Sequence, residues 1–209
     1  MGNRAVITTK RNWQCGGVGI YLHWNGGRDS VEAFLKYCEL KGYRAQDKDG
    51  PYGMARLCQV IANFFGGTTD IGIGSVYDLD CNNYDNGVYI IEGWEIVDRK
   101  YFKGEEQNEY DLDEFMLEID NRMPVRERIK GYLQGKEKKP EELKIGDKIA
   151  FLDWGGQLRY SEVIGIGLDR FINGTNVKGI PYIDLYGTEN PEDNINNYLR
   201  DGADFRVIE

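Results

Sequence analysis

The chain opens with two β-strand patterns, Arg4-Ala5-Val6-Ile7-Thr8-Thr9 and Gly17-Val18-Gly19-Ile20-Tyr21-Leu22-His23-Trp24. In the second pattern, Val18, Ile20 and Leu22 alternate with other residues, which is the period of a strand that buries one face. Residues 11–16 between the two patterns are expected to form a hairpin loop. Asn25-Gly26-Gly27 then breaks the second strand. The fold is therefore predicted to begin with an antiparallel pair.

Helical patterns follow this pair. Asp29 with Glu32 and Asp111 with Glu114 have the spacing of a helix N-cap followed by an acid three residues later. A third apolar stripe covers residues 53–65, and residues 70–74 and 88–97 have strand character. The first part of the chain is thus predicted to be α+β, with a mainly antiparallel sheet and two or three helices.

The segment Gln134 to Glu142 has the composition of a linker, because it is charged, contains Gly and Pro, and lacks large apolar residues. It would separate an α+β domain at 1–133 from a second domain at 143–209. The second domain shows short strands at close spacing, around 148–151, 160–166, 180–186 and 205–208. This pattern predicts a small β-barrel, similar to SH3-like folds.

Charge is distributed unevenly along the 209 residues, whose formal net charge is −9. Residues 80–120 contain 13 Asp and Glu against 3 Lys and Arg, a net charge of −10. An acidic protein repels nucleic acid, so direct nucleic-acid binding is disfavoured. A basic protein, such as one with a nucleic-acid channel, is the expected partner, although many acidic surfaces serve only solubility.

The composition excludes several other classes. No apolar run approaches the roughly 20 residues that cross a bilayer, so a cytoplasmic protein without a membrane association is expected. The four cysteines are 23, 20 and 23 residues apart and form no C-x-x-C pair. Reduced thiols, no metal site and no cofactor are the resulting expectations.

One set of residues permits a catalytic reading. His23 is the only histidine, and it lies at the end of a predicted strand just before a helix start. Cys15 lies in the loop expected to face it, and would act as a nucleophile with His23 as base. Asp29 would orient the imidazole. A packing role for His23 in the turn is the favoured alternative.

The partner-binding residues are expected in the acidic run before and within the third helix. Acids in a first helical turn stabilise the helix dipole, which accounts for part of this run. The surplus indicates an interaction surface made of Glu105, Glu106, Glu109, Asp113, Glu114 and Glu118. A separate aromatic set, Trp13, Tyr21 and Trp24, is a candidate stacking pocket for a small ligand.

The segments Met1-Gly2-Asn3-Arg4-Ala5 and Tyr21-Leu22-His23-Trp24-Asn25-Gly26 resemble a group of proteins from phages and conjugative elements. Those proteins start M-[GS]-x-R-A and carry a Y-x-H-W-[DN]-G segment. The resemblance covers residues 1–30, and Gly27-Arg28 departs from the Tyr-Pro of many members. It implies a mobile-element setting, in which small acidic proteins inhibit host defences such as CRISPR or restriction nucleases. It carries over no catalytic residue.

The leading hypothesis from the sequence is therefore a non-enzymatic, two-domain inhibitor or adaptor that binds a basic, nucleic-acid-binding defence protein. Two alternatives remain open. One is a small hydrolase or RNA-processing enzyme that uses His23. The other is a protein that sequesters a nucleotide between aromatic side chains without turnover.

Overall fold

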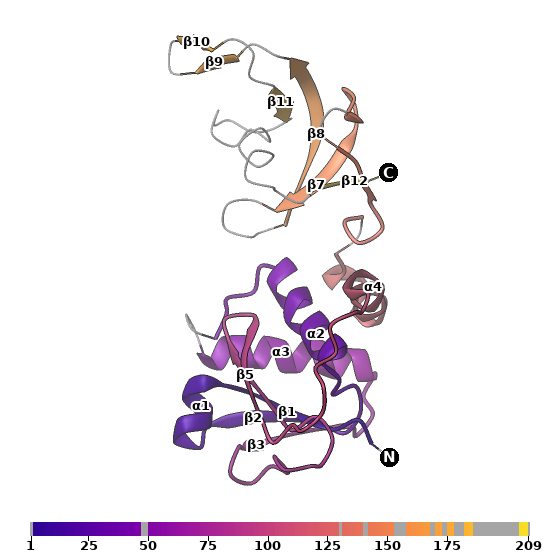
Figure 1. Cartoon of the computed structure of the whole chain (residues 1–209). Helices are drawn as coiled ribbons and strands as arrows, with labels where there is room; N and C mark the ends of the chain where they lie inside the picture. The colour runs from indigo at the N-terminus through magenta and orange to yellow at the C-terminus, as the bar shows by residue number, and fades with distance from the viewer. Residues whose placement is uncertain are drawn as a thin grey trace. The chain divides into compact units, whose positions relative to one another are not determined.

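The computed structural model of the chain divides into two compact units, Met1–Arg128 and Ile129–Glu209 (Figure 1). The structure describes residues 2–46, 50–129, 131–139, 142–152, 158–167, 170–172, 175–177, 182–185 and 205–208. The two units are considered separately below. Each unit has a sheet of its own, and the first unit also contains the α-helices from α1 (Lys10–Cys15) to α4 (Leu112–Arg122).

The first unit is built on a five-stranded sheet. Its strands are β1 (Ala5–Thr9), β2 (Val18–Leu22), β3 (Ile71–Ser75), β4 (Val88–Glu92) and β5 (Glu95–Lys100), in the order β3-β2-β1-β4-β5. The pair β1–β4 is parallel, and the other three pairs are antiparallel. The mixed α+β class and the mainly antiparallel sheet are confirmed.

Two local predictions need correction. Residues 11–16 were expected to form a loop, but residues 11–15 belong to the short helix α1 (Lys10–Cys15). Thr9 caps this helix by accepting a hydrogen bond from the Asn12 N–H at 3.1 Å. Residues 88–97, expected as one strand, form β4 and β5 with a tight turn between them. Gly93 at this turn has a φ of +62°, a conformation that glycine adopts without steric cost.

Three helices accompany the sheet: α2 (Arg28–Leu40), α3 (Gly50–Phe65) and α4 (Leu112–Arg122), with the 3₁₀ turn η1 (Val125–Glu127) after α4. Figure 1 shows α2 and α3 over one side of the sheet. Phe34, Phe64 and Phe115, one from each helix, pack with ring centroids 5.2–6.0 Å apart. No helix in the described part of the chain is long and apolar enough to span a membrane.

The sheet buries side chains on both faces, although Val18 on β2 and Ile73 on β3 are exposed. Side chains alternate along a strand, so the register places Ile7, Ile20 and Tyr89 on the face that the helices cover. Val6, Val88 and Ile90 lie on the opposite face and form a second cluster. Trp13, Tyr21, Leu79 and Cys81 pack against this cluster. The segment that follows β3 therefore serves as a cover for the face that has no long helix.

The second unit contains an antiparallel sheet in the order β11-β8-β7-β12-β6 and a separate pair β9–β10. These strands are β6 (Lys136–Glu137), β7 (Lys148–Leu152), β8 (Leu158–Gly167), β9 (Arg170–Ile172), β10 (Thr175–Val177), β11 (Tyr182–Leu185) and β12 (Phe205–Ile208). Ile149, Phe151, Val163 and Phe205 are in its core. Within the described residues, β11 and β6 are unpaired edges, and closure into an SH3-like barrel stays a prediction.

The unit boundary lies after Arg128, five residues before the end expected for the first domain. Tyr132 and Leu133 are buried, and the Arg206 guanidinium lies 4.9 Å from the Tyr132 ring centroid. Lys136–Glu137, inside the expected linker 134–142, pairs with β12. The difference arises because a charged, edge-strand segment has the same composition as a linker. Of the expected strand at 180–186, residues 182–185 form β11, and positions 180–181 and 186 lie outside the described residues.

A buried hydrogen bond joins α4 to α2. The Tyr37 hydroxyl donates to Oδ1 of Asp120 at 2.6 Å, and both residues are buried. Burial and the neighbouring carboxylate raise the pKa of Tyr37, so it remains a donor throughout the range in which proteins are stable.

We predict that Tyr37→Phe lowers the free energy of unfolding by about 2 kcal/mol, because the buried Asp120 loses this donor. Urea denaturation measures the change. The matched control is Tyr84→Phe, which removes the same atom from an exposed ring and is expected to change stability by less than about 0.5 kcal/mol. Equal effects of the two substitutions would contradict the role of this hydrogen bond.

An ion pair ties the chain start to the segment before β4. The Arg4 Nε donates to Oδ2 of Asp85 at 2.7 Å, and this hydrogen bond lowers the pKa of Asp85. A lowered pKa in the folded state means that the carboxylate contributes stability above its unfolded pKa of about 3.9. The contribution is lost as the pH falls through the folded pKa.

The stability difference between the wild-type protein and Asp85→Asn is therefore expected to be largest at neutral pH and to shrink as the pH falls from about 4. Denaturation series at several pH values measure it. Asp78→Asn is the control, since Asp78 is exposed and has no ion pair in the described chain. A difference that grows on acidification would be inconsistent with the Arg4–Asp85 pair.

Candidate functional site

The acidic run expected to bind a partner lies between β5 and the end of α4. Asp111 caps α4, because its Oδ1 accepts hydrogen bonds from the backbone N–H groups of Asp113 and Glu114 at 2.9 and 3.1 Å. Asp113 and Glu114 occupy the first helical turn, where their negative charge interacts favourably with the positive end of the helix dipole. The capping pattern read from the sequence is therefore present, and it uses part of the local charge.

Glu106 is used inside the protein, where it pairs with two arginines. Its Oε2 lies 2.6 Å from Nη1 of Arg99 and 3.3 Å from Nη1 of Arg28. The Arg99 side chain is only 9% exposed and packs against the Tyr89 and Phe102 rings, with its Cζ 4.1 and 3.6 Å from their centroids. This arrangement leaves Glu106 less available to a partner than the sequence indicates, and its role in partner binding stays a prediction.

Tyr110 provides a second attachment of the same segment. Its hydroxyl donates to the Glu32 carboxylate, which also accepts a hydrogen bond from Arg28 Nε at 2.7 Å. The carboxylates around Arg28 outweigh its partial burial and raise the pKa of its guanidinium. Arg28, Glu32, Glu106 and Tyr110 thus form one network that holds the segment before α4 against α2.

The acids that remain available are fewer than the sequence indicates. Glu105, Glu109 and Glu114 are exposed and have no ion pair within the described residues. Glu118 is exposed and pairs with Arg122 at 2.8 Å, a surface pair of small energetic value. Asp113 is half-buried. The free negative charge therefore concentrates at Glu105, Glu109 and Glu114.

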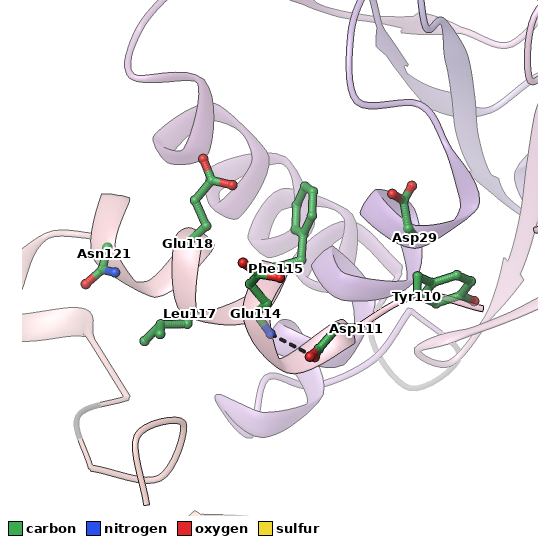
Figure 2. Close-up of a pocket in the computed structure, with 8 residues that line it drawn as sticks. All are labelled: Asp29, Tyr110, Asp111, Glu114, Phe115, Leu117, Glu118 and Asn121. Atoms are coloured by element: carbon green, nitrogen blue, oxygen red, sulfur yellow. Dashed lines mark hydrogen bonds between the residues drawn. The ribbon is translucent and has the colours of Figure 1, made fainter. Parts of the chain in front are cut away.

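Glu114 and Glu118 line a cleft of about 520 Å³ (Figure 2). Asp29 of α2 lines it together with Asp111, Glu114 and Glu118. Figure 2 shows Phe115 between the Asp29 and Glu118 side chains, so the cleft combines carboxylates with an aromatic wall. This composition suits a cationic side chain with an apolar stem, such as Lys or Arg.

Asp29 and Asp111 were not predicted as part of an acidic binding site. Asp29 was assigned to a catalytic role, and the helix-cap pattern explained Asp111 locally. The relevant signal is their position near helix starts. Asp111 is the N-cap of α4, whereas Asp29, expected as the N-cap of α2, lies in the first turn of that helix, which Gly27 caps without a side-chain hydrogen bond. Only the packing of the two helices, which the sequence pattern does not specify, brings the two acids to one cleft.

The proposed Cys15–His23 pair is not brought together. Cys15 ends α1, which precedes β2, whereas His23 directly follows the other end of β2. A five-residue strand spans roughly 17 Å, so the two side chains lie at opposite ends of the hairpin. The expectation of facing loops is wrong because the strand between them is fully extended.

His23 also lacks an orienting acid. Its ring lies 5.2 Å from the Trp24 ring and 6.5 Å from the Tyr21 ring, and no carboxylate partner is present in the described chain. Asp29 instead accepts hydrogen bonds from Ser30, at 2.7 Å from the backbone N–H. His23 and Trp24 are both exposed, and the His23 backbone N–H donates to the Asp70 carbonyl at 2.8 Å, so a packing role for the His23 side chain stays a prediction.

The three aromatic residues expected to form a ligand pocket, Trp13, Tyr21 and Trp24, do not line one cleft. Trp13 and Tyr21 pack on the second core cluster, on the sheet face away from the long helices. Trp13 lines a cleft of about 590 Å³ with Tyr77 and Tyr101, and neither Tyr21 nor Trp24 lines that cleft. Trp24 is exposed beside His23. The three residues do not form one stacking pocket.

In the described part of the chain, no group of three His, Cys, Asp or Glu side chains is arranged to hold a metal ion.

Comparison with known proteins does not assign the chain to a family. No family model matches the chain, and no significant similarity to a curated protein or a solved structure is found.

Glu106→Gln is predicted to lower the free energy of unfolding by about 1–2 kcal/mol, because two guanidinium groups lose a shared carboxylate. Chemical denaturation measures the loss. The neighbouring Glu105→Gln removes the same charge from an exposed side chain and is expected to have an effect below about 0.5 kcal/mol. If both substitutions were neutral, the internal role of Glu106 would be excluded.

Proposed function

We propose that the protein is a non-enzymatic inhibitor or adaptor that binds a basic, nucleic-acid-binding protein through the acidic surface around α4. The acidic surface is defined by Glu105, Glu109, Glu114 and Glu118 and by the cleft that Asp29 and Asp111 also line. The observation that carries the proposal is the exposure of Glu105, Glu109 and Glu114 without a cation partner in the described chain.

The spacing of the acids supports a surface that competes with nucleic acid. Glu114 and Glu118 are four residues apart on α4, which is about 6 Å along a helix axis. A DNA strand carries one phosphate for every 3.4 Å or so of its axis. Two carboxylates on successive helical turns therefore present negative charge at an interval close to that of alternate phosphates. Arg or Lys side chains that bind phosphates would accept such an array.

The cleft adds specificity to this electrostatic attraction. Exposed charges mainly set the association rate and its salt dependence. The Phe115 ring and the Asp29, Asp111 and Glu114 carboxylates supply a place for one inserted basic side chain. An anchor residue in a cleft surrounded by weaker contacts is the usual arrangement of an interface hot spot.

The biological target in this proposal is a host defence nuclease of the CRISPR or restriction type. Support comes from the resemblance of residues 1–30 to proteins of phages and conjugative elements, a setting in which such inhibitors occur. The second unit would provide a further contact surface, and we propose an SH3-like barrel for its complete strand set. The hydrolase alternative has lost its main support, since Cys15 and His23 lie apart.

Reversing the charges at Glu105, Glu109 and Glu114 to Lys is predicted to slow association with the partner about tenfold or more. The test captures proteins from a host lysate at low salt, identifies those displaced by double-stranded DNA, and measures their association rate with purified variants. All three side chains are exposed, so the fold is expected to survive.

The matched control reverses three exposed acids elsewhere, Asp78, Glu95 and Glu162, and changes the net charge by the same amount. It is expected to associate at nearly the wild-type rate. Equal loss in both triple variants would show a general charge effect and contradict a defined acidic surface. Recovery of no DNA-displaceable protein would contradict the proposed partner class.

A further inference from the structure

A large cavity on the helix-covered side of the first unit is separate from the acidic surface. Its volume is about 1020 Å³, and it lies between α1, the start of α3 and the sheet. Ile20 of β2, Ile73 of β3 and Ile91 of β4 form its floor. The register pairs Ile20 with Ile73, so these two side chains are neighbours on one face. The floor is thus a flat aliphatic surface.

The floor is incompletely covered by the protein. Ile73 is 59% exposed, and Val18, which also lines the cavity, is 44% exposed. Met54 and Pro51 from α3 form part of its wall, and Asn12 and Cys15 from α1 form another part. An open cavity with an apolar floor and polar groups at its walls is the usual form of a small-molecule site.

Gln46 is the most unusual group in this cavity. It lies just before α3, lines the cavity and is only 7% exposed. Neither Nε2 nor Oε1 of its side chain has a hydrogen-bond partner. A buried amide without partners is costly, and such groups in folded proteins normally have a partner or a function. Both atoms are themselves buried, so the carboxamide meets a ligand only after its side chain rotates into the cavity. Donor and acceptor would then lie side by side on the same group.

Positive charge lies at the α1 part of the wall. Lys10 and Arg11 of α1 both line the cavity. Lys10 has a long ion pair with Glu92, at 3.9 Å, and Glu92 also lines the cavity. Arg11 is exposed and has no ion pair among the described residues. Arg11 is therefore the side chain available to bind an anionic group.

From these features we infer that the cavity is a binding site for a nucleotide. The aliphatic floor accepts the face of the base. The Gln46 carboxamide pairs with an adjacent donor and acceptor on the edge of the base, as Gln and Asn do with adenine. The Arg11 guanidinium on α1 binds the phosphate. No bond is made or broken at this site.

This site differs from the aromatic pocket expected from the sequence. Trp13, Tyr21 and Trp24 are absent from its lining, and aliphatic side chains take their place. It is also independent of the acidic surface on α4, since the two share no lining residue. A failure of either proposal therefore leaves the other untouched.

The test is isothermal titration calorimetry of the full chain with AMP, adenosine and ribose 5-phosphate. AMP is expected to bind with one site per chain, adenosine more weakly, and ribose 5-phosphate weakest. Gln46→Leu is expected to weaken AMP binding by about tenfold or more, because the pairing edge is lost. Arg11→Ala is expected to weaken the binding of AMP and leave that of adenosine unchanged.

Thermal unfolding without nucleotide gives a second readout. Gln46→Leu is expected to raise the melting temperature or leave it unchanged, because it replaces a buried amide that lacks partners. Gln59→Leu is the matched control, since Gln59 lies on α3, is exposed and does not line the cavity. Absence of AMP binding at millimolar concentration, equal binding by Gln46→Leu, or a lowered melting temperature of that variant would each overturn the proposal.

Discussion

The first unit depends on one carboxylate shared by two guanidinium groups. Glu106 lies between Arg28 at the start of α2 and Arg99 on β5, and so connects the segment before α4 to both a helix and the sheet. Arg99 in turn lies against two aromatic rings and is almost fully buried. A buried guanidinium requires a carboxylate partner, so this segment has little freedom to move. The position of α4, and with it the acidic surface, follows from that constraint.

Because several acids are used inside the fold, the net charge counted along the sequence is larger than the negative charge that is exposed on the surface. Of the acids in residues 80–120, Glu106 and Asp85 pair with arginines, Asp120 is buried against Tyr37, and Asp111 caps a helix. Such acids stabilise the fold. Glu105, Glu109 and Glu114 are exposed and pair with no cation in the described chain, so they are the acids most available to a partner.

Much of the fold could be predicted from periodicity and capping. The opening strands and the helices that start at Arg28 and Leu112 lie where alternating or helical patterns place them. The parallel pairing of β1 with β4 could not be predicted, because it joins residues about 80 positions apart that carry no mutual signal. The helix α1 was missed because six residues are too few for a periodic pattern. Of the site, Glu114 and its neighbours were predicted, whereas Asp29, the cavity and Gln46 depend on packing between distant segments.

We propose that the acidic surface occupies a nucleic-acid-binding surface of a basic protein. The most direct measurement is a competition experiment, in which a labelled DNA duplex bound to the captured partner is titrated with this protein and followed by fluorescence anisotropy. We expect the DNA to be released in full, and higher salt to weaken both complexes. Formation of a stable ternary complex that retains the DNA would contradict it.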